Sequence, residues 1–467
     1  MRILFVRPAP PPDTIGLQHI MIVEPLELEV LAALVGTDDT CMIADMILEK
    51  KPLEKILEDF RPDLFCVTGY ITHMDTIRNF CRMAKSILPD VHTVTGGVHV
   101  EKFPEDIDDP AVDFRVVRNA TRAFPKLIAH LKNNAPRPLE ILAPGEKLDE
   151  KLLPPFDFYF PIPRRDLTMK YRRGYFYVFH NRVALVKTSF GCPYTCRFCY
   201  CRKITNDQYF AGPMEEVIAE LKGIREKEIY IVDDDFLLSP TRLLTFISRV
   251  KQENIKKKYL VFGRADFIAE HAELIKELHE VGLRTVIVGI ESFNDDELDS
   301  FEKRTTREIN EKALKVLKEN HVDCYAAVIT SPDWSKDDFR KAGDKLVEMG
   351  IQFVNLQPLT PLKGTGIEVP DEELVIRRED YPKWDLAHVV IRPKHMTIKE
   401  YYEQVLKLYE RIVFQPKNLL YHALHHPLSI QWKLAKGIIR IRKQYRDRIE
   451  HSSETYAQDT LHTADSI

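Results

Sequence analysis

The chain has 467 residues, of which 44% are apolar and 30% are charged, a balance typical of a globular protein with two or three domains. Its formal net charge of −4 argues against nucleic acid as the main partner. No apolar run approaches the roughly 18 to 20 residues of a membrane span, and the opening Met-Arg-Ile-Leu-Phe-Val-Arg-Pro is typical of a first strand rather than of a secretory signal.

Residues 1–132 alternate short strand-like and helix-like runs. Strands are predicted at 2–7, 40–47, 64–68, 92–95 and 113–118, and helices at 26–35, 53–60, 75–88 and 123–131. This alternation predicts a doubly wound parallel sheet, which binds ligands beyond the carboxyl ends of its strands. Two of those ends carry glycine, at Thr68-Gly69 and Gly96-Gly97, where a ligand can approach the backbone closely. A plain turn is the alternative at each position.

Residues 133–178 are rich in proline and charge and predict an extended linker between two domains. Arg164 and Arg165 lie within it. They either reach an anionic group of a substrate or cofactor, or remain solvated.

Residues 179–370 alternate again. Strands are predicted at 183–188, 228–232, 259–262, 285–289, 323–329 and 353–356, with helices between them. Six such units predict a partial (β/α)6 barrel with its chemistry at the strand carboxyl ends. Polar residues follow those ends, namely Asp233-Asp234-Asp235, Gly263-Arg264, Gly289-Ile-Glu291-Ser and Gln357. The triple Asp predicts a metal site or, for one of the three, a cap on the next helix.

The first of these strands leads into Cys192-Pro-Tyr-Thr-Cys196-Arg-Phe-Cys199-Tyr200. Three thiols at this spacing bind three irons of a four-iron cluster and leave the fourth iron open. A zinc knuckle or buried thiols are the alternatives, but no fourth Cys or Cys/His pair at finger spacing follows, and Cys201 is too close to join the same cluster comfortably. No cysteine follows Cys324, which excludes further clusters toward the C-terminus.

The remaining cysteines are scattered along apolar segments. Cys41, Cys66, Cys81 and Cys324 are expected to be reduced core residues. This usage favours the cytoplasm, where thiols stay reduced and an oxygen-labile cluster survives.

With an aromatic residue before its last cysteine, the motif resembles the signature of the radical S-adenosylmethionine (SAM) enzymes. The order of pieces in residues 1–132 resembles the cobalamin-binding domain that precedes the radical SAM domain in a large subfamily. The resemblance implies a 4Fe-4S cluster on Cys192, Cys196 and Cys199, with SAM chelated at the open iron. It implies SAM contacts from Tyr200, Asp234 (or Asp235), Arg264, Glu291 and Gln357, and cobalamin contacts from Thr68, Gly69, Thr72, Gly96, Gly97 and His99. A surface salt bridge is the alternative for Arg264.

Two departures from that family matter. The Asp-x-His-x-x-Gly motif, which supplies a histidine to cobalt in other cobalamin proteins, is absent, so the loop Tyr70–His73 is the expected neighbour of cobalt. His73 either ligates cobalt or caps the following helix, and we favour the cap. Arg118-Asn-Ala-Thr-Arg122 replaces a run rich in Gly and Glu, so a domain that has lost its cofactor is an alternative.

Residues 371–450 predict a helical domain, and residues 451–467 predict a disordered polar tail. The stretch Leu428–Arg446 is apolar on one side and basic on the other. It is expected to contact an anionic membrane surface or a lipid substrate, or to pack against the open side of the barrel.

The resemblance implies three functional hypotheses. The first is methylation of an unactivated carbon of a small or lipid-like metabolite, through a 5′-deoxyadenosyl radical and methylcobalamin. The second is a radical rearrangement, ring closure or ring contraction with cobalamin but without methyl transfer. The third is a non-catalytic cobalamin sensor or carrier. Both enzymes would need an external electron donor of the flavodoxin or ferredoxin type.

Overall fold

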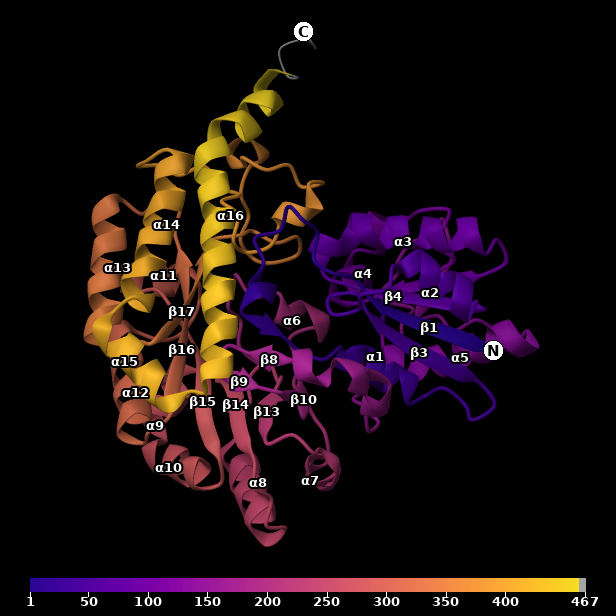
Figure 1. Cartoon of the computed structure of the whole chain (residues 1–467), viewed down its shortest axis with the longest axis horizontal. Coiled ribbons are helices and arrows are strands. Elements are labelled where there is room, and N and C mark those ends of the chain that lie inside the picture. Colours follow the sequence, from indigo (N-terminus) through magenta and orange to yellow (C-terminus); the bar gives the residue numbers. More distant parts are fainter. Residues whose placement is uncertain (462–467) are drawn as a thin grey trace.

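The computed structural model describes residues 1–461, with side chains described as far as Ser452. Its N-terminal part is a six-stranded sheet in the order β3-β1-β4-β5-β6-β7. The strands are β1 (Arg2–Arg7), β3 (Thr40–Asp45), β4 (Leu64–Thr68), β5 (His92–Gly96), β6 (Phe114–Val116) and β7 (Ile141–Leu142). All pairs are parallel except β6 with β7. The predicted doubly wound sheet is confirmed (Figure 1).

Helices cover both faces of this sheet because alternate strand residues point to opposite sides. Leu4 and Val6 of β1 pack under α2 (Leu53–Phe60) and α3 (Met74–Ile87). Ile3 and Phe5 pack under α1 (Leu26–Ala32) and α5 (Ala120–Asn133). The short α4 (Val98–Lys102) follows Gly97 directly and leads into the 3-10 turn η3 (Pro104–Ile107).

Residues 133–178 are not the extended linker that the sequence predicts, because they contain regular secondary structure. They supply the edge strand β7, the long 3-10 segment η4 (Arg165–Gly174) and β8 (Phe176–Tyr177). β8 pairs antiparallel with both β2 (Met21–Ile22) and β9 (His180–Asn181), so it joins the two halves of the molecule.

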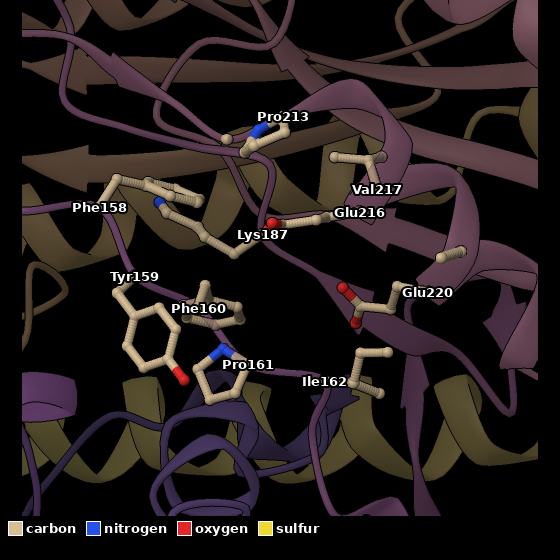
Figure 2. A pocket seen from close by; sticks show the side chains of 12 residues that line it. Phe158, Tyr159, Phe160, Pro161, Ile162, Lys187, Pro213, Glu216, Val217 and Glu220 are labelled. Carbon is tan, nitrogen blue, oxygen red and sulfur yellow. The ribbon is translucent and has the colours of Figure 1, made fainter.

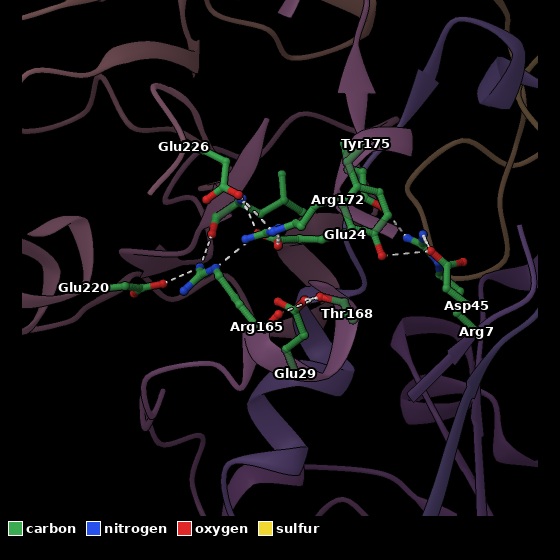
Figure 3. Close-up of polar contacts among 12 residues, drawn as sticks. Arg7, Glu24, Glu29, Asp45, Arg165, Thr168, Arg172, Tyr175, Glu220 and Glu226 are labelled. Carbon is green, nitrogen blue, oxygen red and sulfur yellow. Dashed lines mark hydrogen bonds and ion pairs between the residues drawn. The ribbon is translucent and has the colours of Figure 1, made fainter. Parts of the chain in front are cut away.

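A buried ionic network fixes this junction (Figure 3). Glu24 is fully buried and pairs with Arg172 and with Arg165, whose Nε lies 3.3 Å from Glu24 Oε1. The Nη2 atom of Arg165 also lies 2.6 Å from Glu220 of α7 (Met214–Gly223). Arg165 therefore holds the two domains together and is neither solvated nor aimed at a ligand. Arg164, in contrast, forms an exposed pair with Asp166.

The second sheet has the order β10-β13-β14-β15-β16-β17 and is parallel throughout. Its strands are β10 (Ala184–Val186), β13 (Glu228–Ile231), β14 (Lys258–Gly263), β15 (Leu283–Glu291), β16 (Asp323–Thr330) and β17 (Phe353–Pro358). Besides α7, its helices are α8 (Pro240–Gln252), α9 (Ala265–Glu270), α10 (Ala272–Glu280), α11 (Asp295–Ser300), α12 (Arg307–Glu319) and α13 (Lys336–Glu348). This is the predicted partial (β/α)6 barrel.

The strand amino ends of the barrel are closed. His180 at the β8–β9 hairpin contacts Glu228 (2.9 Å) and Thr285 (3.0 Å) at the starts of β13 and β15. Inward-facing strand residues such as Tyr230 and Tyr325 share one apolar cluster with Phe176 and Val178 of the hairpin and with Ile430 and Leu434. Only the carboxyl ends of the strands are left for chemistry.

The C-terminal part contains α14 (Ile398–Val413), α15 (Pro416–His425) and α16 (Leu428–Leu461), preceded by the 3-10 turns η5 (Asp371–Glu373) and η6 (Tyr381–Lys383). α16 packs against the barrel through Ile430 and Leu434, as the sequence analysis expected as one alternative for residues 428–446. It continues through residues 451–461 of the predicted tail, and residues 462–467 lie outside the described part of the chain. Within the described residues, no helix is both long and apolar enough to cross a membrane.

Candidate functional site

The cysteine loop begins at the carboxyl end of β10 and is anchored to the rest of the barrel. It lies between the small strand β11 (Ser189–Phe190) and the single-turn helix α6 (Cys201–Ile204). Gly191 has φ +80°, and a Cβ there would collide with the carbonyl oxygen of Gln208. The Arg197 N–H donates to Phe301 O (3.0 Å), and Gly366 N–H donates to Arg197 O (2.7 Å). The loop is therefore fixed at both its entry and its middle.

The three consecutive aspartates after β13 have three different environments. Asp233 is buried and accepts hydrogen bonds from the backbone N–H groups of Thr188 (2.6 Å) and Ser189 (3.0 Å). Asp234 accepts from Gly191 N–H at 2.7 Å, at the entry to the cysteine loop. The predicted helix cap is wrong for this run, because Ser239 caps α8.

Asp235 is the member of the run that has no partner. It is 2% exposed, and neither carboxylate oxygen has a hydrogen bond among the described residues. Burial raises its pKa to about 7, although nearby Arg264 opposes the shift. A buried carboxylate with two unused acceptors is costly unless a ligand satisfies it.

Arg264, at the end of β14, faces the cysteine loop. Its Nη1 atom lies 3.7 Å from Cys196 Sγ, and its guanidinium stacks over the Tyr194 ring at 3.7 Å. Its Nη2 donates to Asp266 and to Lys303 O, each at 2.7 Å. Arg264 does form a salt bridge, with Asp266, but it is only 6% exposed, so this bridge is buried and not at the surface. These contacts leave at most one N–H of Nη1 for a further ligand.

Glu291 ends β15 in a left-handed conformation (φ +60°) where the pairing with β16 is irregular. Its Oε1 lies 2.9 Å from Lys303 Nζ, and both side chains are buried. A non-glycine residue in this conformation stores strain, which is typical of functional sites. Lys303 escaped the sequence analysis because the run Glu302-Lys303-Arg304 has the composition of a solvated loop.

Tyr200 and Gln357 lie at opposite sides of the barrel sheet. The Tyr200 hydroxyl donates to Val98 O at 3.0 Å, so the cysteine loop contacts the first domain directly after Gly97. Gln357 lies in β17 opposite Ile329 of β16 and is half-buried.

The local environment shifts the pKa values of the three cysteines in different directions. Burial raises the pKa of Cys192 to about 12 and also raises that of Cys196, which Lys303 and Arg264 oppose. A hydrogen bond from Cys201 lowers the pKa of Cys199 to about 7. Among the described residues, no three His, Cys, Asp or Glu side chains converge to hold a single metal ion. A four-iron cubane binds each thiolate at a different iron, so its ligands need not converge, and the set fits a cluster.

In the first domain, the two glycine-bearing strand ends lie side by side. Thr68 pairs with Gly96 in the sheet register, and Thr68 Oγ1 donates to Gly96 O at 3.3 Å. Gly97 has φ +109°, and a Cβ there would lie 2.7 Å from Gly69 O. Beside them, the Thr95 hydroxyl is buried and has no hydrogen-bond partner within the part of the chain that the structure describes. A side-chain-free edge with an unused hydroxyl fits the polar tail of a large cofactor.

Thr72 and His73 follow this edge. Thr72 Oγ1 lies 3.1 Å from His73 Nδ1, and both residues are buried. His73 occupies the N-cap position of α3, but its side chain makes no cap hydrogen bond, so the favoured capping role is wrong. Burial lowers the pKa of His73 to about 4, which keeps the imidazole neutral.

His99 is already bonded within the domain junction. Its Nε2 lies 2.9 Å from Asp106, and Asp106 lies 2.9 Å from Lys363 Nζ in the loop after β17. The His99 ring also packs against Phe103. His99 therefore links the edge of the first domain to the end of the barrel.

The altered segment Arg118–Arg122 holds the linker. The Asn119 amide donates to Pro155 O (2.8 Å) and accepts from Asp157 N–H (3.0 Å). Arg122 lies 3.9 Å over the Tyr159 ring. Residues that replace the glycine-rich run thus position the aromatic stretch that follows.

That stretch forms one wall of a cavity of about 280 Å³ (Figure 2). Phe158, Phe160 and Ile162 face Pro213 and Val217 across it, with Lys187, Glu216 and Glu220 at its polar parts. Phe190, two residues before Cys192, packs against Phe158 and Phe160 with ring centroids 5.5 and 6.0 Å apart. An aromatic surface thus connects this cavity to the cysteine loop.

Comparisons with known proteins match both halves. Residues 186–356 match the family model of the radical SAM superfamily, and residues 20–128 match that of the B12 binding domain. Hopanoid C-3 methylase of Methylococcus capsulatus is 26% identical over 447 residues, covering 92% of this chain and 83% of the relative. Anaerobic magnesium-protoporphyrin IX monomethyl ester cyclase of Cereibacter sphaeroides is 22% identical over 397 residues (81% and 64%). The radical SAM methyltransferase TsrM of Kitasatospora setae, solved with cobalamin and a [4Fe-4S] cluster, has a TM-score of 0.66 at 15% identity (96% and 99%), which shows a shared fold.

Proposed function

Because this chain belongs to the cobalamin-dependent radical SAM enzymes, we propose that it methylates an unactivated carbon of a small or lipid-like metabolite. When bound, the [4Fe-4S] cluster and SAM supply the radical that removes a substrate hydrogen, and cobalamin supplies the methyl group. The relatives named as methylases support methyl transfer as the outcome.

One observation carries the proposal. The Tyr200 hydroxyl donates to Val98 O at 3.0 Å, so the residue after Cys199 touches the residue after Gly97. The cluster loop and the glycine-bearing edge of the first domain are therefore direct neighbours. A substrate between them would meet a radical source on one side and a methyl source on the other, and this proximity is what methyl transfer to a carbon radical requires.

The surrounding residues would have distinct tasks. Cys192, Cys196 and Cys199 hold the cluster, and the positive charges of Arg264 and Lys303 stabilise the Cys196 thiolate. Asp235 offers two acceptor oxygens to a cationic or hydroxyl-bearing ligand such as SAM. Glu291, Tyr200, Asp234 and Gln357 complete the SAM side. Thr68, Gly69, Thr72, Gly96, Gly97 and His99, with the unpaired Thr95 hydroxyl, form the cobalamin side.

A lipid-like substrate is supported by the aromatic cavity. Its wall of Phe158, Phe160 and Ile162 would bury an apolar group, and Phe190 continues that surface toward Cys192. The relative that acts as a hopanoid methylase agrees with this choice.

Ring closure without methyl transfer is the second candidate, and the cyclase relative favours it. It uses the same cofactors and differs in whether a methyl group leaves SAM. A non-catalytic carrier of cobalamin is disfavoured, since it needs neither the three-cysteine loop nor the strained Glu291.

The proposal includes an external electron donor of the flavodoxin or ferredoxin type, because the cluster has to be reduced before SAM is cleaved. It also places the chain in the cytoplasm, since all eight cysteines are free thiols. A contact between the C-terminal helices and a membrane surface is a separate proposal that does not depend on this chemistry.

Cysteine variants test the three-thiol assignment. In protein reconstituted with iron and sulfide, Cys192→Ala, Cys196→Ala and Cys199→Ala are each expected to lose the cluster absorbance and SAM cleavage. Cys201→Ser is the matched control, because it removes the thiol but keeps a hydrogen-bond donor beside Cys199, and it is expected to keep both. Loss of the cluster in Cys201→Ser, or SAM cleavage without the three thiols, would contradict the assignment.

A further inference from the structure

Large apolar side chains are exposed in one part of the molecule above all others. Of the fifteen that are exposed among the described residues, seven lie between residues 414 and 439, with exposed fractions from 49% to 75%. They are Phe414, Leu419, Leu420, Leu424, Leu428, Trp432 and Ile439. Such a concentration of exposed apolar side chains in one segment points to a contact surface.

The same segment is strongly basic. From Arg411 to Arg446 the sequence contains no Asp or Glu, although the chain as a whole has a net charge of −4. Eight cationic side chains lie in it: Arg411, Lys417, Lys433, Lys436, Arg440, Arg442, Lys443 and Arg446. Arg411 and Arg442 pair with Asp344 and Glu410, which lie outside the segment. The remaining six cations have no acid within the segment to offset them, so it attracts anionic surfaces.

Helix geometry separates the two faces of α16. Ile430, Leu434 and Tyr445 are buried against the rest of the protein. On the outer side, Leu428, Trp432 and Ile439 lie within about 40° of one another at 100° per residue. Lys436, Arg440 and Lys443 are exposed along the flank of this stripe. An exposed apolar stripe beside a basic flank is the geometry of an interfacial helix.

The inner side is fixed, so the outer side is not needed for folding. Phe179 of the β8–β9 turn stacks on His422 (4.1 Å) and His426 (4.2 Å). The Tyr421 hydroxyl donates to Asp323 (2.8 Å), and Asn418 donates to Ile412 O (2.8 Å). Figure 1 shows that α15 leads into the lower end of α16. The exposed leucines of α15 and the exposed residues at the start of α16 therefore lie on two consecutive helices.

We propose that the outer faces of α15 and α16 dock this protein onto the surface of an anionic lipid bilayer. The apolar stripe enters the acyl boundary, and the basic flank pairs with the headgroups. A neutral apolar partner would use the stripe but not the exposed cations Lys436, Arg440 and Lys443 beside it. The proposal agrees with a lipid-like substrate but rests on this surface alone, so it stands or fails independently of the chemistry.

Vesicle binding by the full-length protein tests it. We expect co-sedimentation with phosphatidylcholine vesicles that contain about one third phosphatidylglycerol, at least about tenfold stronger than with phosphatidylcholine alone and weakened by high salt. Trp432 provides a direct probe, since it is 67% exposed whereas Trp334 and Trp384 are buried. Its emission should shift to the blue on binding, and the shift should vanish in Trp432→Phe.

Two double variants separate the contribution of the apolar stripe from that of the basic flank. Leu428→Ser/Trp432→Ser should lose most vesicle binding, and Lys436→Glu/Lys443→Glu should lose the preference for anionic vesicles. Leu244→Ser, which removes an exposed leucine on α8, is the matched control and should bind normally. The variants should keep the wild-type melting temperature and SAM cleavage.

Three results would overturn the proposal. They are no vesicle binding by the wild-type protein, equal binding to neutral and anionic vesicles, and self-association through Leu428 and Trp432 in place of vesicle binding. Loss of SAM cleavage in the wild-type protein would instead refute the proposed function and leave this surface untouched.

Discussion

At the scale of single residues, Asp235 distinguishes this site most clearly. Its neighbours Asp233 and Asp234 accept hydrogen bonds from the backbone of the cysteine loop, whereas its own two oxygens are buried without partners. A protein of marginal stability keeps such a group only where a ligand uses it. We therefore propose that this carboxylate serves ligand binding rather than the fold.

Asp235→Asn tests this assignment. At pH 8 the variant removes a buried, unpaired charge, so we expect the free energy of unfolding of the cofactor-free protein to rise by about 1 kcal/mol. SAM affinity is expected to fall about tenfold, as for the loss of one charge-assisted hydrogen bond. Thermal unfolding and equilibrium dialysis measure the two effects. Lower stability with unchanged SAM affinity would show that Asp235 is structural.

The sequence predicted this site in part. The cysteines, Arg264 and Glu291 belong to recognisable motifs, and the structure brings Arg264 to 3.7 Å from Cys196 Sγ. The sequence could not distinguish Asp235 from Asp234, because both follow the same strand end. Only the three-dimensional packing decides which of the two carboxylates is hydrogen-bonded. Lys303 lies in a loop and belongs to no motif, since its role depends on its contact with Glu291 at the end of β15.

At the scale of elements, most strands and helices of both sheets follow their hydrophobic periods and were predicted within a few residues, whereas the short helices α4, α9 and α11 were not predicted. The segment 133–178 was not. Its conformation depends on partners distant in sequence, such as Glu24 and Glu220, which pair with Arg165 inside the junction. Proline and charge are typical of linkers, but here Arg165 and Arg172 are buried and paired with glutamates (Figure 3).

Glu29 makes the junction sensitive to pH. Its Oε1 accepts from Thr168, while Oε2 is buried without a partner. Burial, together with nearby Glu24, raises its pKa to about 8. The folded state therefore holds a proton that the unfolded state loses near its ordinary pKa of about 4.3. The stability that the protonated Glu29 contributes is complete below about pH 4.3 and is lost as the pH rises through about 8.

Glu29→Gln should remove this dependence. At pH 8.5 the variant is expected to be more stable than the wild type by at least about 1 kcal/mol, or roughly 2–4 °C in melting temperature. At pH 5 the two should unfold alike. Glu58→Gln, at an exposed carboxylate, is the control and should follow the wild type at both pH values. A wild type that is as stable as Glu29→Gln at pH 8.5 would contradict the shifted pKa.

At the scale of the whole molecule, two ligand-binding edges meet. The carboxyl ends of the first sheet carry Gly69 and Gly97, those of the barrel carry the cysteine loop, and Tyr200 joins them through Val98. Lys363 makes a second bridge, from the loop after β17 to Asp106 and so to His99. Each domain could be predicted from its own hydrophobic pattern. The contact between the domains could not, because neither pattern encodes which edges of the two sheets face each other. That contact lets two cofactors act on one substrate.

One measurement tests the central claim most directly. The reconstituted protein, with cobalamin and a reductant, is incubated with SAM bearing a trideuteromethyl group and a lipid extract from cells that lack the protein. Methyl transfer consumes two SAM molecules per turnover, so we predict 5′-deoxyadenosine and S-adenosylhomocysteine in equal amounts, with the trideuteromethyl group in a lipid product. 5′-Deoxyadenosine alone, without S-adenosylhomocysteine or a labelled product, would contradict methylation and favour ring closure or rearrangement.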